Sequence, residues 1–476
     1  MRTFSINTLG CKVNQYEGQQ IRELLENRGL RQAEWPQPPD LAVVHTCCVT
    51  HTASAKSRQC IRKVLKHSPQ SLILVCGCLP AAQTGELSCF SENVHLVSNR
   101  SDLAAALTHW TQRKPNTTIK AKNAQKIKHK NEPENESELP LLTSFAHQTR
   151  AYLKVQDGCD GYCSYCIVPR TRPIVRSKPL DAALFEAKTL VQSGHKEIVV
   201  SGVFLGAYGR KTVRRRNWPD RMNDNLADLL ERLAQIPGLE RIRLSSLEPA
   251  DVTEPLLDTF CKHRNIMPHL HLPLQSGSDK VLARMCRQYR LDDFKRTVDS
   301  LRTRLDRPAI TTDIMVGFPG ETDADFEQTL ELARFVGFAK MHVFMFSPRR
   351  RTAAADMPDR IERAVCKERS QILRQLDVEL GRRFRGQFIG ETAEVLIEPQ
   401  AGRPDWTDGQ TGRSQRYFQV FLDARCSIAS SQPESRIENR ARQARLSDQV
   451  TRANIVRVRL IENLQDGMVG VVNGDF

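Results

Sequence analysis

The chain has 476 residues, 40% of them apolar, and a formal net charge of +15. No apolar run approaches the ~18–20 residues of a membrane span and the N-terminus lacks a signal-peptide core, which predicts a cytoplasmic protein of two to four domains with no membrane partner. The charge favours a polyanionic partner, nucleic acid first, and the 14 cysteines indicate metal binding or catalysis before disulfides, because the cytosol keeps thiols reduced.

Residues 1–112 are predicted to form a Rossmann-like α/β domain. Its buried parallel strands are expected at Thr3–Leu9, Leu41–Val44 and Leu72–Val75, with helices at Gly18–Arg28 and Ala53–Lys66. Each strand ends at a cysteine, and the carboxyl ends of parallel strands form the ligand crevice of an open sheet. The pattern therefore predicts a metal site, with ordinary strand-end thiols as the alternative. The candidate ligands are Cys11, Cys47 and Cys78, and the neighbouring Cys48 and Cys76 leave the choice open.

Residues 113–148 differ in composition from the rest. Six lysines fall between Lys114 and Lys130, and an acidic stretch follows from Glu132 to Glu138. This pattern offers no apolar face, so we predict a flexible, solvated linker. A contact between its lysines and RNA is the alternative.

Alternating strands and helices resume at Arg150, and six β/α units fit within residues 149–380. The expected strands are Tyr152–Gln156, Glu197–Ser201, Arg241–Ser245, His269–Leu274, Thr311–Val316 and Met341–Phe346. Helices are expected between them, for example at Ala182–Gln192, Leu226–Ile236, Asp292–Arg302 and Asp325–Phe335. This order predicts an incomplete (β/α)6 barrel, open at one side, with its chemistry at the carboxyl ends of the strands.

Three cysteines follow the first barrel strand at a Cys-x3-Cys-x2-Cys spacing: Cys159, Cys163 and Cys166. Three close thiolates can hold three irons of a four-iron cluster and leave the fourth iron open for a chelating molecule. Zinc is the alternative, but it needs a fourth ligand nearby, and the next histidine and cysteine are His195 and Cys261. The spacing therefore favours an iron–sulfur cluster.

Residues 381–476 are predicted to form a small β-barrel of the oligonucleotide-binding kind, with a structural cap as the alternative. The expected strands are Glu391–Ile397, Tyr417–Leu422, Val456–Leu460 and Met468–Val472. A polar, basic insertion at residues 427–454 interrupts them, and its composition assigns no structure.

The three-cysteine spacing after a first barrel strand resembles the radical S-adenosylmethionine superfamily. The resemblance implies that S-adenosylmethionine chelates the open iron and that one electron cleaves it to a 5′-deoxyadenosyl radical, which takes hydrogen from an unactivated carbon. Tyr165 lies where the superfamily has an aromatic residue beside the adenine. Gly202 and Gln275, after the second and fourth strands, are further candidates for contact with the cofactor, with turn and cap roles as the alternative.

Several ordered motifs resemble the methylthiotransferase family within this superfamily. They are Thr8-Leu9-Gly10-Cys11-Lys12-Val13-Asn14-Gln15-Tyr16-Glu17, Thr46-Cys47-Cys48-Val49-Thr50, Lys56-Ser57-Arg58-Gln59, Gly77-Cys78, Gln275-Ser276-Gly277-Ser278 and Gly317-Phe318-Pro319-Gly320-Glu321-Thr322. The match spans nearly the whole chain and implies a TRAM-like C-terminal module. It also implies an auxiliary four-iron cluster, whose open iron binds the sulfur to be transferred. Its implied ligands are Cys11, Cys47 and Cys78 rather than Cys48 or Cys76.

The resemblance implies a transferase of alkylthio groups that uses two molecules of S-adenosylmethionine, one as methyl donor and one as radical source. The first motif resembles the branch that adds methylthio to carbon 2 of N6-threonylcarbamoyladenosine at position 37, in the anticodon loop of tRNA. An electron-donor protein and a sulfur source are the other implied partners. The alternatives are N6-isopentenyladenosine 37 of tRNA, a ribosomal-protein aspartate and, in a different class, a non-enzymatic iron–sulfur RNA-binding redox sensor.

Three places depart from the family pattern. Pro173 and Ile174 stand where Gly-Arg is usual, His45 stands for the usual Asn, and Arg351 for the usual Gly. Each lies near a substrate or cofactor loop, so the resemblance assigns no role to the arginines beside them. These are Arg172, Arg176 and Arg349.

Overall fold

A computed structural model of the protein describes residues 1–34, 36–82, 93–99, 102–111, 139–146, 148–217, 224–398, 410–423 and 455–472, together with Gly85, Leu87 and Phe90. Most of the predicted linker, residues 113–148, and all of the predicted insertion, residues 427–454, lie outside the described residues. Among the helices that the structure describes, none is long and apolar enough to cross a bilayer.

The first part of the chain forms a five-stranded parallel sheet in the order β2-β1-β3-β4-β5. Its strands are β1 (Thr3–Thr8), β2 (Arg31–Gln32), β3 (Leu41–Thr46), β4 (Leu72–Gly77) and β5 (Val94–Leu96). Its helices are α1 (Lys12–Asn27), α2 (His51–His67), α3 (Cys78–Ala82) and α4 (Leu103–Thr111). Side chains of a strand alternate between faces, so Ile73 lies in the core layer under α2 and Leu74 in the layer under α1 and α4. The sheet is therefore covered on both faces.

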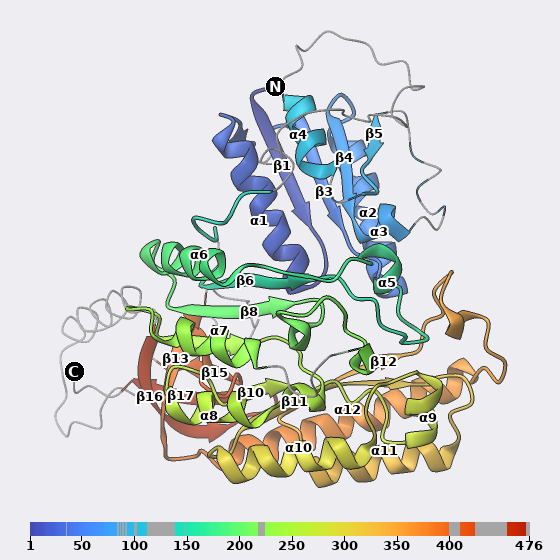
Figure 1. Ribbon diagram of the computed structural model, residues 1–476, viewed down its shortest axis with the longest axis vertical. Helices are drawn as coiled ribbons and strands as arrows, with labels where there is room; N and C mark the ends of the chain where they lie inside the picture. Colours follow the sequence, from blue (N-terminus) through green and yellow to red (C-terminus); the bar gives the residue numbers. More distant parts are fainter. Residues whose placement is uncertain are drawn as a thin grey trace.

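Six parallel strands in the order β6-β8-β9-β10-β11-β12 form the central, incomplete barrel (Figure 1). They are β6 (Arg150–Asp157), β8 (Glu197–Gly202), β9 (Arg241–Leu244), β10 (His269–His271), β11 (Ala309–Val316) and β12 (Lys340–Met345). Only isolated bridges join β9 to the β10 side, at Ile242–Ile266 and Ser246–His271, and β7 (Arg176–Ser177) pairs antiparallel with the free edge of β6. The predicted (β/α)6 fold class is confirmed.

Helices cover the outer face of this barrel. They are α6 (Leu180–Gln192), α7 (Asn225–Ala234), α8 (Glu254–Lys262), α9 (Asp279–Arg284), α10 (Leu291–Arg304), α11 (Asp323–Val336) and α12 (Arg363–Gly386). The short helix α5 (Val168–Thr171) instead contacts α3 of the N-terminal part. Ile198 and Val200 of β8 pack in the core beneath the helices, so Glu197 and Val199 face the barrel interior. The barrel interior therefore holds charged side chains, and Glu197 pairs there with Arg243 at 2.8 Å.

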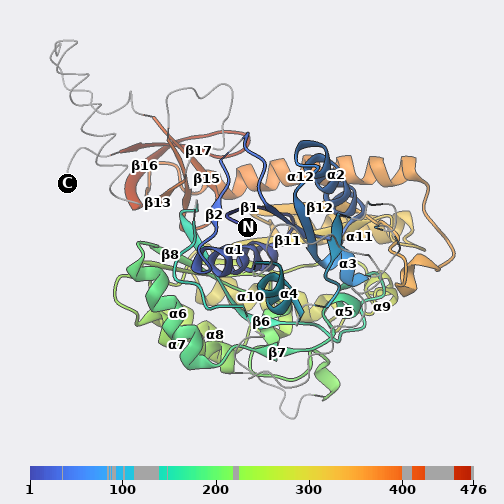
Figure 2. The same ribbon diagram turned by 90° about the horizontal axis from the view of Figure 1, so that it is seen from above.

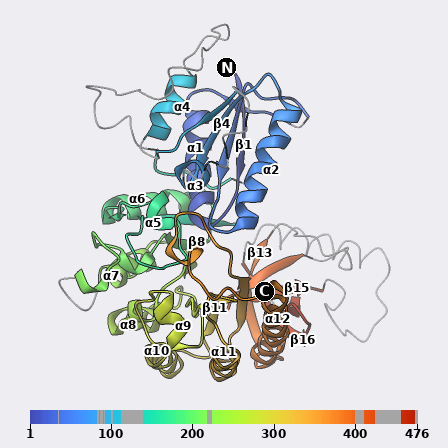
Figure 3. The same cartoon turned by 90° about the vertical axis from the view of Figure 1, so that its right-hand side faces the viewer.

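The last part of the chain closes into a five-stranded barrel in the order β13-β14-β15-β17-β16, as the predicted small β-barrel required. Its strands are β13 (Thr392–Glu398), β14 (Thr411–Ser414), β15 (Gln419–Leu422), β16 (Ile455–Asn463) and β17 (Met468–Val472). The end of α12 lies beside this barrel (Figure 3). It supplies Phe384 to the barrel core. We expected the helices to stop near Gly381, but α12 continues to Gly386.

The N-terminal sheet stands over the central barrel, with α1 nearest to β6 and β8 (Figures 1 and 2). The carboxyl ends of β1, β3 and β4 point toward the barrel (Figure 1). Chain segments that carry the two groups of cysteines are thereby brought to a common boundary.

Candidate active site with two cysteine trios

The first trio, Cys159, Cys163 and Cys166, lies in the loop that directly follows β6, at the predicted end of the barrel. The loop begins at Gly158, whose φ of +79° belongs to the left-handed region that favours glycine. The amide of Cys159 donates to the main-chain oxygen of Arg172 at 2.9 Å, and the amide of Cys166 donates to that of Cys163 at 3.0 Å. These two hydrogen bonds fold the loop back on itself. The three thiols lie close enough for each to influence the other two electrostatically.

Burial affects the protonation of two thiols of this trio, Cys159 and Cys166. It raises the pKa of Cys159 to about 12 and that of Cys166 to about 12. These two thiols are therefore protonated near neutral pH, and each must lose its proton to become a metal ligand. Two donors already point at the sulfurs: the amide of Gly161 to Cys159 Sγ at 3.3 Å and Arg287 Nη1 to Cys163 Sγ at 3.3 Å.

Arg287 is a site residue that no sequence motif indicated. Arg287 Nη2 forms an ion pair with Glu248 Oε1 at 2.7 Å, and Arg287 Nη1 also donates to the hydroxyl of Tyr165 at 3.4 Å. The Tyr165 ring packs edge-on against Phe318, with ring centres 6.5 Å apart. Tyr165 is thus fixed beside the first trio, and its contact with the adenine of the cofactor stays a prediction.

The second trio, Cys11, Cys47 and Cys78, gathers at the carboxyl ends of β1, β3 and β4. All three pairs of thiols act electrostatically on one another, so the predicted convergence occurs. Gly10, with φ of +108°, permits the close approach, since a Cβ atom there would lie 2.9 Å from Cys47 Sγ. The Asn14 side-chain amide ties the loops together by donating to the main-chain oxygens of Leu9 at 2.8 Å and Thr46 at 3.0 Å.

The two alternative cysteines of this region lie differently. Cys48 is adjacent to the trio, since its thiol donates to the main-chain oxygen of Cys78 at 3.3 Å. A hydrogen bond with Cys48 is the main influence that lowers the pKa of Cys78, and Arg172 also lowers it, whereas burial raises it. Cys76 faces the other way, into the core layer beneath α1 and α4.

The donor sets fit two iron–sulfur clusters. Every cysteine that the structure describes is a free thiol. In the described part of the chain, no three His, Cys, Asp or Glu side chains surround a single metal-ion position. A four-iron cluster does not need such a point, because its thiolates bind separate irons. Each trio would supply three thiolates and leave one iron open.

The other predicted contacts of S-adenosylmethionine lie at the same end of the barrel. Gly202 ends β8, and a Cβ atom there would lie 3.0 Å from Gln156 Oε1. Gln275 follows β10 with φ of +61°, an uncommon conformation for a residue other than glycine, and bridges to Ile314 of β11. Their contact with the cofactor stays a prediction.

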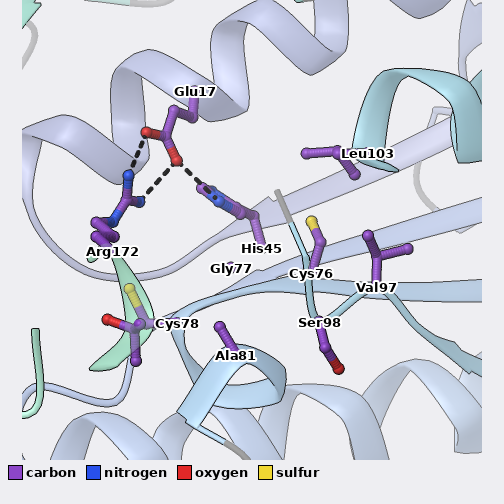
Figure 4. A pocket seen from close by; sticks show the side chains of 11 residues that line it. Glu17, His45, Cys76, Gly77, Cys78, Ala81, Val97, Ser98, Leu103 and Arg172 are labelled. Atoms are coloured by element: carbon purple, nitrogen blue, oxygen red, sulfur yellow. Dashed lines mark hydrogen bonds and ion pairs between the residues drawn. The ribbon is translucent and has the colours of Figure 1, made fainter. Parts of the chain in front are cut away.

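The departures from the family pattern make contacts of their own. His45 is buried, with Nε2 3.4 Å from Glu17 Oε2 (Figure 4). Its Nδ1 lies 3.2 Å from the main-chain oxygen of Asn14. Arg351 adopts φ of +69°, which explains the usual glycine, and donates to the main-chain oxygen of Ala82 at 2.9 Å. Arg349 donates to Ser54 Oγ at 2.9 Å and to the main-chain oxygen of Cys48. The loop after β12 therefore forms hydrogen bonds with loops and helices of the N-terminal domain.

Comparison with known proteins agrees with this geometry. Residues 153–333 match the model of the radical SAM superfamily, and residues 3–98 match "Uncharacterized protein family UPF0004". The chain is 37% identical over 406 residues to a threonylcarbamoyladenosine tRNA methylthiotransferase MtaB of Chlamydia pneumoniae, covering 84% of this chain and 88% of the relative. The relative of the same name from Thermotoga maritima is 37% identical, with 84% and 87% covered.

The chain is also similar to a second kind of tRNA-modifying relative and to a solved structure. The tRNA-2-methylthio-N(6)-dimethylallyladenosine synthase of Bartonella bacilliformis is 33% identical, covering 89% of this chain and 90% of that protein. The solved structure of the radical S-adenosylmethionine methyltransferase TsrM from Kitasatospora setae, with cobalamin and a [4Fe-4S] cluster bound, aligns with a TM-score of 0.51 at 13% identity. It covers 75% of this chain and 74% of the other, which supports a shared fold alone.

Proposed function

The chain belongs to the methylthiotransferase family of radical S-adenosylmethionine enzymes, and we propose that it converts N6-threonylcarbamoyladenosine at position 37 of tRNA to its 2-methylthio derivative. Family membership establishes iron–sulfur clusters and S-adenosylmethionine as its cofactors. The observation that carries the substrate proposal is the 37% identity, over 84% of the chain, with relatives named for that nucleoside.

The two cysteine trios divide the work in this proposal. Cys159, Cys163 and Cys166 hold the cluster that binds S-adenosylmethionine, and Cys11, Cys47 and Cys78 hold the auxiliary cluster that carries sulfur. When bound, these groups supply a radical that takes hydrogen from carbon 2 of the adenine and a methylthio group that replaces it. An electron-donor protein and a sulfur source are required as co-reactants. The protein itself binds the clusters, orients the base and keeps water away.

A cation near the second trio supports the choice of substrate. Lys12 follows Cys11 directly, and its side chain is partly exposed. Burial lowers the pKa of Lys12, Tyr417 opposes this shift, and the positive charges of Arg150 and Arg243 add to it. A negatively charged ligand beside Lys12 would favour the charged form of this side chain. The threonylcarbamoyl group carries a carboxylate, whereas the isopentenyl group of the rival substrate is uncharged and apolar.

The proposal is tested with the reconstituted full chain and anticodon stem-loop RNAs that differ only at position 37. We expect methylthiolation of RNA with threonylcarbamoyladenosine, detected by nucleoside mass spectrometry, and none with isopentenyladenosine or adenosine. Product only on isopentenyladenosine would reassign the substrate. Reductive cleavage of S-adenosylmethionine without product on any of the three RNAs would point to the ribosomal-protein alternative. An intact cofactor after reduction would favour a redox sensor.

A further inference from the structure

A buried cluster of four charges joins the N-terminal sheet to the central barrel. Glu17 comes from α1, Lys154 and Asp157 from β6, and Arg172 from the segment after α5. The Arg172 guanidinium holds Glu17 through two bonds of 2.8 Å (Figure 4). It also holds Asp157 through one bond of 2.9 Å. Lys154 Nζ lies 3.1 Å from Glu17 Oε1 and 3.6 Å from Asp157 Oδ2.

This group of four charged side chains has no net charge and is shielded from water. Two carboxylates balance two cations, and the side chains of Glu17 and Arg172 are 2% and 9% exposed. Charges in such a place attract strongly and are little screened by salt. The two-bond fork of Arg172 on Glu17 also fixes direction, which a lysine at this position could not do.

Arg172 contacts the first trio through its main chain. Its carbonyl oxygen accepts the amide hydrogen of Cys159 at 2.9 Å, which fixes the first ligand of the loop. Asp157, which Arg172 binds, also accepts the amide of Gly158 at 3.0 Å. Arg172 therefore fixes the start of the loop in two ways, directly at Cys159 and through Asp157 at Gly158.

Arg172 contacts the second trio through its side chain. Nη2 donates to Asn14 Oδ1 at 3.3 Å, and the same Asn14 side chain ties the loops that carry Cys11 and Cys47. The guanidinium also acts on the Cys78 side chain, both by its charge and by a hydrogen bond. Arg172 thus acts on Cys78 directly and on the loops of Cys11 and Cys47 through Asn14.

We propose that Arg172 is a positioning residue that holds the two cysteine trios at a fixed separation and orientation. This inference rests on the proposed function, in which a radical generated at one cluster and a sulfur held at the other must reach the same carbon. Misplacement of reacting groups by about 1 Å can cost about 100-fold in rate. A residue that only stabilises the fold would affect the amount of folded enzyme but not the geometry between clusters.

The test compares Arg172→Met and Arg172→Lys with the matched controls Arg241→Met and Arg241→Lys. Arg241 is even more fully buried and also joins two parts of the chain, donating to the main-chain oxygens of Glu394 at 2.7 Å and Arg413 at 3.1 Å. It contacts the C-terminal barrel instead of the cysteine loops. Both pairs of variants therefore remove a buried arginine that joins two parts of the chain. Only the Arg172 variants also remove contacts to the cysteine loops.

Two readouts are measured on each reconstituted protein. The first is the dipolar interaction between the two reduced clusters, recorded by pulsed electron paramagnetic resonance without RNA. The second is the ratio of 5′-deoxyadenosine to methylthiolated nucleoside with the threonylcarbamoyl RNA. For Arg172→Met we expect iron content near wild type, a broadened dipolar distribution and a ratio raised about tenfold or more. Arg172→Lys should be intermediate, and the Arg241 variants should match wild type in both readouts.

Wild-type values for both readouts in Arg172→Met would overturn the inference, and so would equal changes in Arg241→Met. If Arg172→Met does not fold, the comparison of Arg172→Lys with Arg241→Lys decides in the same way. If wild type forms no product on the RNA, the proposed function fails, yet the dipolar readout still decides whether Arg172 sets the geometry.

Discussion

A Cβ atom on Gly158 would lie 1.8 Å from the main-chain oxygen of Ile174, far inside contact distance. Gly158 starts the loop of the first trio, and Ile174 follows Arg172 and Pro173 on the returning segment. The returning segment cannot easily yield, because Arg172 accepts the amide of Cys159 and is held by buried carboxylates. The loop therefore tolerates only glycine at its entrance.

Gly158→Ala should remove the first cluster and leave the second. The added methyl group displaces the Cys159 loop, so we expect iron to fall from about eight to about four atoms per chain and 5′-deoxyadenosine formation to stop. Gly194→Ala is the control, because Gly194 has φ of +104° with no atom within 4 Å of its Cβ position. Full iron content and cofactor cleavage in Gly158→Ala would refute this account of the loop.

Arg287 should set the reduction potential of the first cluster. It places a positive charge and a hydrogen bond on Cys163 Sγ, and both stabilise the reduced cluster. Arg287→Met should therefore lower the midpoint potential, measured by redox titration in a chain whose second trio is replaced by alanine. Arg215→Met is matched to it, since Arg215 approaches the same Glu248 at 3.4 Å. An equal shift in both variants would mean that Arg287 acts only through Glu248.

Lys12 should discriminate between substrates. Loss of a charge-assisted bond to the threonyl carboxylate predicts that Lys12→Met lowers kcat/KM on threonylcarbamoyl RNA by about 10- to 100-fold. Lys12→Arg should retain most activity because it keeps the charge. Cleavage of S-adenosylmethionine without RNA should stay unchanged in both variants. Equal losses for Lys12→Met and Lys12→Arg would show that size, not charge, matters at this position.

His269 should make folding sensitive to acid. Burial lowers its pKa well below the ordinary 6.5, and the charges of Arg243, Lys12, His271 and Arg150 act in the same direction. The Tyr417 ring also faces it, with ring centres 4.7 Å apart. The unfolded chain therefore binds a proton near pH 6.5 while the folded chain does not, so stability present above that pH is lost as the pH falls.

The slope of this loss can be measured by denaturant unfolding at pH 7.5, 6.5 and 5.5, compared between wild type and His269→Phe. The wild type should lose up to about 1.4 kcal/mol per pH unit more than the variant below the histidine pKa. Parallel pH profiles for the two proteins would contradict the assignment of a neutral, buried His269.

The strands and the cysteine loops were predictable because their signals are local. A buried parallel strand is a short apolar run, and each one here ends close to its expected residue. Helix α1 begins at Lys12 rather than at the expected Gly18, since Val13 and Tyr16 are buried although polar residues surround them. Strand β14, Thr411–Ser414, has no β composition and forms because β13 and β15 pair with it.

The ion pairs around the site could not be predicted. Arg172 and Glu17 are 155 residues apart, and Arg287 lies 124 residues from Cys163, so no periodicity or spacing connects them. The extension of α12 past Gly381 has a similar origin. A Cβ atom on Gly381 would lie 3.2 Å from the main-chain oxygen of Ala339, so this glycine serves close packing inside the helix instead of ending it.

The most direct test of the central claim is the nucleoside profile of tRNA from a strain in which this gene is deleted. We predict that 2-methylthio-N6-threonylcarbamoyladenosine disappears, that N6-threonylcarbamoyladenosine accumulates in its place, and that expression of the wild-type chain restores the first nucleoside. An unchanged level of the 2-methylthio nucleoside in the deletion strain would contradict the proposed function.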